Sequence, residues 1–95
     1  LLQEAMQRED LSRLRRIGLR QALVSSLVDQ ARGVEAEQES QRLIDEARSA
    51  LGADSRAMFG YWNVRAIALA AAGRPEQAVE ILDNLLAWPD LSPGV

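Results

Sequence analysis

One short segment, Gly73-Arg74-Pro75, restricts the fold more than any other feature of the sequence, because it ends one helix and starts the next. Glycine readily adopts the left-handed conformation that closes a helix. Proline fits the first turn of a helix, where its missing N–H has no partner to lose. Only two or three residues therefore separate two helices, which must fold back on each other as an antiparallel hairpin. Five alanines within residues 66–72 let the two backbones approach closely.

Apolar residues spaced three or four positions apart predict the helices on both sides of this turn, which together form a hairpin over residues 56–88. The first helix runs from Arg56 to Ala72, and Asp54 or Ser55 can cap its start. The second helix starts at Pro75 and is stopped by Pro89. The apolar stripe of the first helix is Phe59, Trp62, Ala66, Leu69 and Ala70, and that of the second is Ala78, Leu82, Leu85 and Leu86.

The same periodicity predicts an earlier hairpin over residues 11–51. One helix spans 11–32, with Gly33 as the break after it, and another spans 38–51 and ends at Gly52. Residues 1–10 have little apolar content and no helix breaker, so whether they continue the first helix stays open at this point. The expected apolar face of 11–32 is Leu14, Ile17, Leu19, Leu23, Val24, Leu27, Val28 and Ala31, and that of 38–51 is Leu43, Ile44, Ala47, Ala50 and Leu51.

A weak internal repeat relates the two hairpins. Residues 43–47 resemble residues 81–85 at an offset of 38, and Gly33 and Gly73 are 40 positions apart. A hairpin of about 40 residues cannot bury its apolar face alone, so successive hairpins stack. We expect one all-α domain over residues 1–95, with antiparallel hairpins stacked as a short right-handed solenoid (an α-α superhelix).

Residues 46–89 resemble the tetratricopeptide repeat (TPR) family, in the kinesin-light-chain-like variety common in large bacterial proteins. Trp62, Ala66, Gly73 and Ala78 fall where that family favours a large residue, a small one, a turn residue and a small one. Three departures are Arg65 in place of the usual leucine, Leu69 in place of a frequent tyrosine, and Pro89 one position early.

The resemblance implies a protein–protein interaction module. The sequence opens with Leu1-Leu2 and not with Met, so we expect it to be part of a longer polypeptide. The absence of cysteine fits any redox compartment, so a cytoplasmic location is the default expectation. In such folds the first helix of each hairpin lines a concave groove that holds a partner peptide or helix. Carried over to this chain, the partner-binding residues are Asn63, Ile67, Ala70 and Arg56. Asn63 is the candidate for hydrogen bonding to the backbone of the bound peptide.

Composition argues against an enzyme. The chain of 95 residues contains no histidine and no cysteine, so its serines lack a histidine partner, and no glycine-rich phosphate loop occurs. We therefore expect no catalytic residue, no cofactor and no metal. The carboxylates of Glu35, Glu37, Glu39, Asp45 and Glu46 are typical of a solvated helix face. No run approaches the roughly 20 apolar residues that span a bilayer, so we expect no membrane insertion.

An arginine cluster in the first helix admits two interpretations. Arg13, Arg16 and Arg20 share one helical face and could contact an anionic ligand. The favoured alternative places this face beside the acidic segment 35–46 or beside another protein. A net charge of −3 and the lack of aromatic residues around the cluster argue against a nucleic-acid partner.

Self-association is the second candidate function. The long apolar first helix could form a homo-oligomer, which would make the chain an oligomerisation or regulatory domain of a larger enzyme or transcription regulator.

Overall fold

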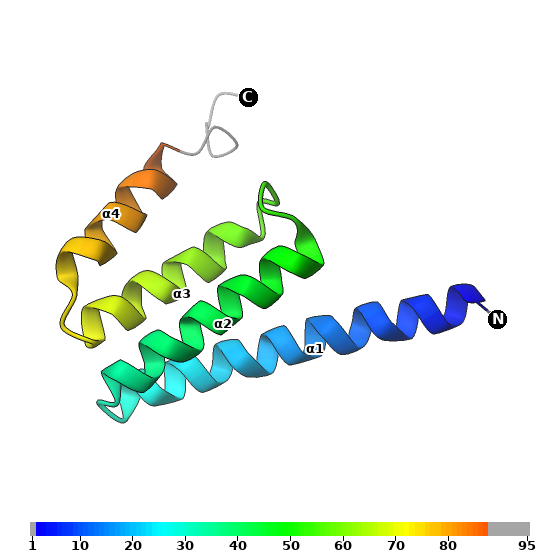
Figure 1. The fold of residues 1–95 in the computed structure, drawn as a ribbon, viewed down its shortest axis with the longest axis horizontal. Coiled ribbons are helices and arrows are strands. Elements are labelled where there is room, and N and C mark those ends of the chain that lie inside the picture. Colours follow the sequence, from blue (N-terminus) through cyan, green and yellow to red (C-terminus); the bar gives the residue numbers. More distant parts are fainter. Residues whose placement is uncertain (1, 88–95) are drawn as a thin grey trace.

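Residues 2–87 fold into four α-helices joined by short turns (Figure 1). The computed structural model describes residues 2–87, with side chains from residue 11 onward. The helices are α1 (Leu2–Asp29), α2 (Gly33–Leu51), α3 (Met58–Ala71) and α4 (Pro75–Leu86). No strand occurs within residues 2–87, and the predicted all-α class is confirmed.

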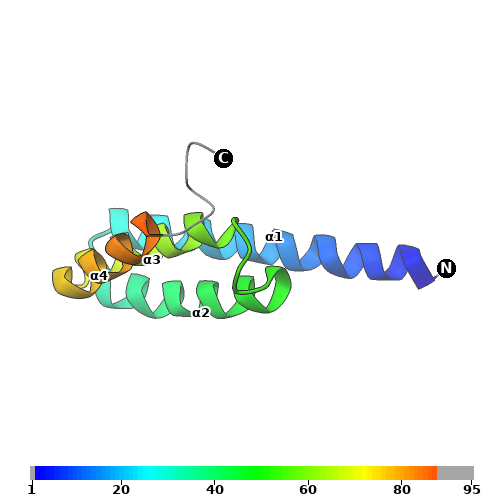
Figure 2. The ribbon, with the colours of Figure 1, turned by 90° about the horizontal axis from the view of Figure 1, so that it is seen from above.

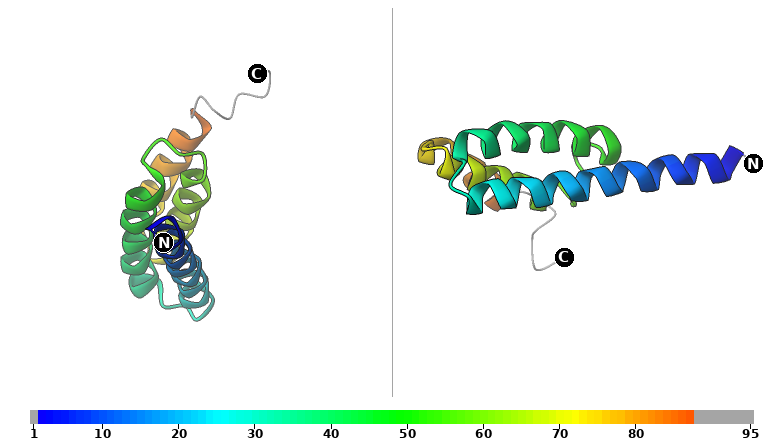
Figure 3. Two further views of the ribbon diagram at one scale, coloured as in Figure 1. Left: turned by 90° about the vertical axis from the view of Figure 1, so that its right-hand side faces the viewer. Right: turned by 90° about the horizontal axis from the view of Figure 1, so that it is seen from below.

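Successive helices run antiparallel in an array of dimensions 48 × 38 × 16 Å, and α2 lies in a different layer from α1 and α3 (Figure 2). α2 packs between α1 and α3, α3 also contacts α1, and α4 packs on α3. α1 is the longest helix, and its N-terminal part extends past the other three helices (Figure 2). The whole length of α2 runs beside α1 (Figure 3). Residues 2–10 therefore continue the first helix, which settles the point that the sequence left open. The right-handed solenoid stays a prediction.

The first interhelical turn differs from the expected break at Gly33. Ala31 adopts the left-handed conformation, with φ 60°. The N–H of Arg32 donates to the Leu27 carbonyl at 2.9 Å, and the N–H of Ala31 donates to the Val28 carbonyl at 3.0 Å. These two bonds close α1 in a Schellman motif. Because Ala31 performs the closing role, α2 begins at Gly33 instead of the expected position 38.

Gly33 has a different task, which is to permit close packing. A Cβ at this position would lie 2.1 Å from the Ala71 carbonyl oxygen and 2.8 Å from the Ala72 nitrogen. Gly33 is buried, so the first residue of α2 rests directly on the backbone at the end of α3. The close approach depends on the missing side chain.

The second interhelical turn has the geometry of the first. Gly73 has φ 82°, its N–H donates to the Ala70 carbonyl at 3.1 Å, and the N–H of Arg74 donates to Leu69 at 2.9 Å. Arg32 and Arg74, which precede α2 and α4, have φ/ψ of −99°/63° and −121°/62°. The expected left-handed glycine at 73 and helix start at Pro75 are both observed.

These turns align the hairpins at an offset of 42 residues, not 38 or 40. Buried positions correspond at the same offset: Val24 with Ala66, Leu27 with Leu69, Ala36 with Ala78, and Leu43 with Leu85. The earlier alignment of residues 43–47 with 81–85 was therefore displaced by about one helical turn.

Three small clusters form the core. The largest joins α1, α2 and α3, the second joins the same helices near the first turn, and the third joins α3 and α4. Their buried members are, in that order, Ile17, Leu43, Ile44, Ala47 and Met58; Val24, Leu27, Ala36 and Ala68; and Ala66, Leu69 and Ala78.

Several residues expected in the core are exposed. Leu14, Leu19, Leu23 and Ala31 of the first hairpin and Ala70, Leu82 and Leu86 of the second lie at the surface. α1 and α4 lie at the two ends of the four-helix array, so neighbouring helices cover only part of their apolar surface.

Helix ends also differ from expectation in the second hairpin. α3 begins at Met58 and not at Arg56, and its N-cap is Ala57, which makes no side-chain capping bond, so the predicted cap by Asp54 or Ser55 is wrong. The Ser55 side chain instead accepts the N–H of Ala57 at 3.3 Å in the turn before the helix. α4 ends at Leu86, and Trp88 and Pro89 lie outside the described residues.

Candidate functional site

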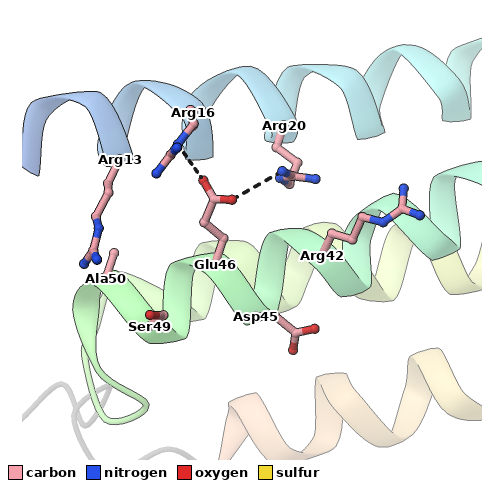
Figure 4. A pocket seen from close by; sticks show the side chains of 8 residues that line it. All are labelled: Arg13, Arg16, Arg20, Arg42, Asp45, Glu46, Ser49 and Ala50. Atoms are coloured by element: carbon pink, nitrogen blue, oxygen red, sulfur yellow. Dashed lines mark hydrogen bonds and ion pairs between the residues drawn. The ribbon is translucent and has the colours of Figure 1, made fainter. Parts of the chain in front are cut away.

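The arginine face of α1 lines a hollow of about 490 Å³ against α2, here named the arginine groove (Figure 4). The structure brings the three predicted residues Arg13, Arg16 and Arg20 together along one side of it. α2 supplies the other side, in agreement with the predicted position of the acidic segment 35–46 beside the arginine face. Its lining residues from α2 are Arg42, Asp45, Glu46, Ser49 and Ala50.

Two carboxylates of α2 hold the centre of this face. Glu46 points between Arg16 and Arg20, with ion-pair distances of 3.6 Å to Arg16 Nε and 3.3 Å to Arg20 Nη2 (Figure 4). Glu39 Oε1 lies 2.7 Å from Arg20 Nη1, and Glu39 Oε2 lies 2.9 Å from Arg42 Nη1. α1 thus lies beside the acidic segment, as the favoured interpretation of the cluster has it.

This network limits what the arginine groove can bind. The Arg20 side chain is 27% exposed and the Glu39 side chain 12%, so their charges are engaged in a partly buried pair. Any anion that entered would compete with Glu46 for Arg16 and Arg20. Buried ion pairs of this kind fix which surfaces meet more than they add net stability. The groove is therefore best described as a link between α1 and α2.

A second hollow lies between α1 and α3, and we name it the α1–α3 groove. Its volume is about 130 Å³, and its lining is mainly aliphatic: Val24, Ser25, Val28, Asp29, Val64 and Ile67. Ile67 is 51% exposed, which is high for an isoleucine on a packed helix.

Of the four predicted partner-binding residues, only Ile67 lines this groove. Asn63 and Ala70 are exposed at positions i−4 and i+3 from Ile67, so the three share one face of α3. Arg56 is exposed in the turn before α3. Sequence reasoning missed the contribution of α1, namely Ser25, Val28 and Asp29, because periodicity within one helix does not reveal which residues a neighbouring helix brings alongside.

Arg65 links α3 to α2, a role that the sequence did not reveal. Its guanidinium donates to the Glu37 carbonyl at 3.2 Å, to Ser40 Oγ at 3.0 Å and to Glu37 Oε1 at 3.2 Å. The side chain is only 14% exposed. One feature of the sequence could have indicated this role: Arg65 stands where the TPR family usually has leucine. An arginine that faces a neighbouring helix needs hydrogen-bond acceptors on that helix.

Trp62 was expected between the two helices of the last hairpin. It is half-buried, packs against the largest core cluster and lies under Arg48, whose Cζ is 5.6 Å from the ring centroid. On its other side a hollow of about 220 Å³ separates it from Ile81, Asn84 and Leu85 of α4.

Two negative findings concern the described residues. Within them, no three carboxylates are grouped closely enough to hold a metal ion. No described helix has the length and apolar character needed to cross a bilayer. Comparison with family models, curated proteins and solved structures finds no match to this chain.

Proposed function

We propose that this chain is a non-enzymatic protein-interaction module of the TPR type, which binds a partner peptide in the α1–α3 groove. The repeated turn at an offset of 42 residues and the packing of α3 on both α1 and α2 support the repeat interpretation. In this arrangement α1 and α3 are the first helices of their hairpins, the helices that line the binding groove in the TPR family.

The observation that carries the proposal is Ile67, half exposed at the edge of an aliphatic groove. A volume of about 130 Å³ lies below the range of roughly 300–1,000 Å³ typical of small-molecule sites. It suits one apolar side chain of a protein partner. Exposed apolar surface beside a hollow marks a site of contact with another molecule.

The polar rim of the groove defines the peptide further. The Asn63 amide both donates and accepts hydrogen bonds, which matches the backbone of an extended peptide. The Asp29 carboxylate at the α1 side favours a basic residue next to the apolar anchor. Because the helices are already formed, most of the ordering cost of binding falls on the peptide.

A peptide-display selection tests this proposal. A random library is selected on the wild-type chain and counter-selected on the Ile67→Glu variant. The matched control is Val34→Glu, which makes the same change at an aliphatic residue, 65% exposed, that does not line the α1–α3 groove. Circular dichroism verifies that both variants fold.

We expect selected peptides to bind the wild type and Val34→Glu equally and to bind Ile67→Glu at least about tenfold more weakly, a difference near 1.4 kcal/mol. Asn63→Ala should weaken binding about two- to tenfold, the worth of one hydrogen bond. Peptides that bind all variants equally, or a selection that enriches none, would refute the groove as a peptide site.

A further inference from the structure

α4 carries an apolar flank that no described helix covers. Val79, Leu82 and Leu86 lie along it at spacings of three and four and are 54%, 40% and 82% exposed. We name these three residues the α4 flank. Such a row on a short outer helix marks a contact surface when its partner can be identified.

The offset of 42 residues identifies the kind of contact. Val79, Leu82 and Leu86 correspond to Glu37, Ser40 and Ile44 of α2. Glu37 and Ser40 accept hydrogen bonds from Arg65 of α3, and Ile44 is buried in the cluster that includes Met58 of α3. The α4 flank is therefore the same helix face by which α2 holds α3.

The surface of α1 that corresponds to the α2-facing side of α3 is exposed at the other end of the four-helix array. Leu19 and Leu23 of α1 are 65% and 45% exposed, and we name them the α1 flank. At the same offset they correspond to Tyr61 and Arg65 of α3. Tyr61 packs against the core cluster that includes Leu43 and Ile44 of α2, and Arg65 donates to Ser40 of α2. The chain thus presents one half of its internal α2–α3 interface at each end.

The two halves match each other in chemistry. Inside the chain, Arg65 is polar and so are its acceptors on α2. At the ends, Leu23 replaces the arginine, while Val79 and Leu82 replace the acceptors. Both sides of the interface are thus polar at this point inside the chain and apolar at its two ends. The α1 flank therefore matches the α4 flank in polarity, as Arg65 matches its acceptors on α2.

Charge favours the same pairing. α4 contains Glu76, Glu80 and Asp83 and no basic residue. α1 contains four arginines and a single carboxylate within residues 11–29, and two of these arginines, Arg16 and Arg20, also pair with carboxylates of α2. Opposite charges favour contact between α1 and α4 of different copies, whereas contact of two α4 helices or two α1 helices brings like charges together.

We propose that a second copy of this chain docks head to tail, with its α1 flank on the α4 flank of the first, in the manner of α3 on α2. A head-to-tail contact leaves one flank free at each end, so further copies add to it as concentration rises. This inference goes beyond the proposed peptide site, since neither flank contains a residue of the α1–α3 groove.

Sedimentation equilibrium over a wide dilution series tests the interface. One variant blocks the α4 flank, Val79→Glu with Leu82→Glu, and the other blocks the α1 flank, Leu19→Glu with Leu23→Glu. We expect the wild-type mass to exceed that of one chain and to rise with concentration, and each blocked variant to stay monomeric. An equimolar mixture of the two variants should form a species of two copies and nothing larger, since each variant keeps the flank that the other lacks.

Three outcomes would overturn the proposal. They are a monomeric wild type at all concentrations, an α1-blocked variant that still dimerises through α4, and a mixture that does not associate. Ile67→Glu should associate like the wild type, so this variant separates failure at the groove from failure at the flanks.

A second measurement keeps the test independent of the paired glutamates. The chain has no cysteine, so Leu23→Cys and Leu82→Cys can be introduced into separate chains. A short bismaleimide reagent should join the two variants to each other in preference to either variant with itself. Equal yields of the three products would contradict head-to-tail docking.

Discussion

Replacement of Gly33 by alanine is the sharpest test of the helix packing described above. The new Cβ would lie 2.1 Å from the Ala71 carbonyl oxygen, whereas ordinary contacts begin at 3.4 Å. The start of α2 and the end of α3 must therefore separate by about 1.3 Å. The obstructing atoms belong to the backbone, so no side-chain rotation relieves the overlap.

The expected loss of stability follows from two opposing terms. Overpacking of this kind costs about 1–3 kcal/mol, and we expect the upper part of that range. The lower unfolded-state entropy of alanine returns about 0.5–1 kcal/mol. A net loss near 2 kcal/mol would lower the melting temperature of a domain of this size by roughly 8–16 °C.

Urea unfolding followed by circular dichroism, at one low protein concentration, measures this effect. The matched control is Gly18→Ala in α1, where a Cβ would have nothing within 4 Å. That change should raise stability by about 0.5–1 kcal/mol. A Gly33→Ala variant as stable as the wild type would refute the close approach of α2 to α3.

Five further substitutions probe the turns and the arginine links. Ala31→Gly should stabilise the fold by about 0.5–1 kcal/mol, because it relieves a left-handed alanine, and Gly73→Ala should cost a similar amount; urea midpoints measure both. Arg20→Met should cost about 1–3 kcal/mol, since it removes one of the two arginine partners of each of the partly buried carboxylates Glu39 and Glu46. Arg16→Met, at a side chain 63% exposed, should cost under about 0.5 kcal/mol. A double-mutant cycle of Arg20→Met with Glu46→Gln measures the interaction free energy of this ion pair, and a value of zero would show that the pair does not contribute to stability. Arg65→Lys should lose about 1 kcal/mol in thermal unfolding, because an ammonium cannot reproduce the guanidinium fork, and an unchanged melting temperature would show that the fork contributes nothing.

Local rules predicted the second hairpin better than the first. Gly73 and Pro75 act at their own positions, so their effects could be inferred without knowledge of the rest of the chain. In the first hairpin the left-handed residue is Ala31, which carries no such preference, and Gly33 serves packing against α3. A glycine needed for distant contact looks the same in the sequence as one needed for a turn.

The candidate site residues show the same difference between what local spacing predicts and what depends on contacts between helices. The positions of Asn63, Ile67 and Ala70 on one face of α3 follow from helical spacing alone. The opposite wall of the α1–α3 groove depends on how α1 lies against α3, which no periodicity reveals. The exposure of Leu19 and Leu86 was missed for a related reason: an apolar residue is buried only where another element covers it, and these two lie on outer helices.

The order of helix contacts has a consequence for local unfolding. α1, α2 and α3 each contact the other two, whereas across the described residues the main contact of α4 is with α3. α4 can therefore open while the three-helix unit stays folded, as a separate unit of low stability. A partner that docks on α4 binds only the closed form, so its apparent affinity is reduced by the fraction of molecules in which α4 is open. Occupancy of that end would in turn hold α4 closed and protect its amides from hydrogen exchange.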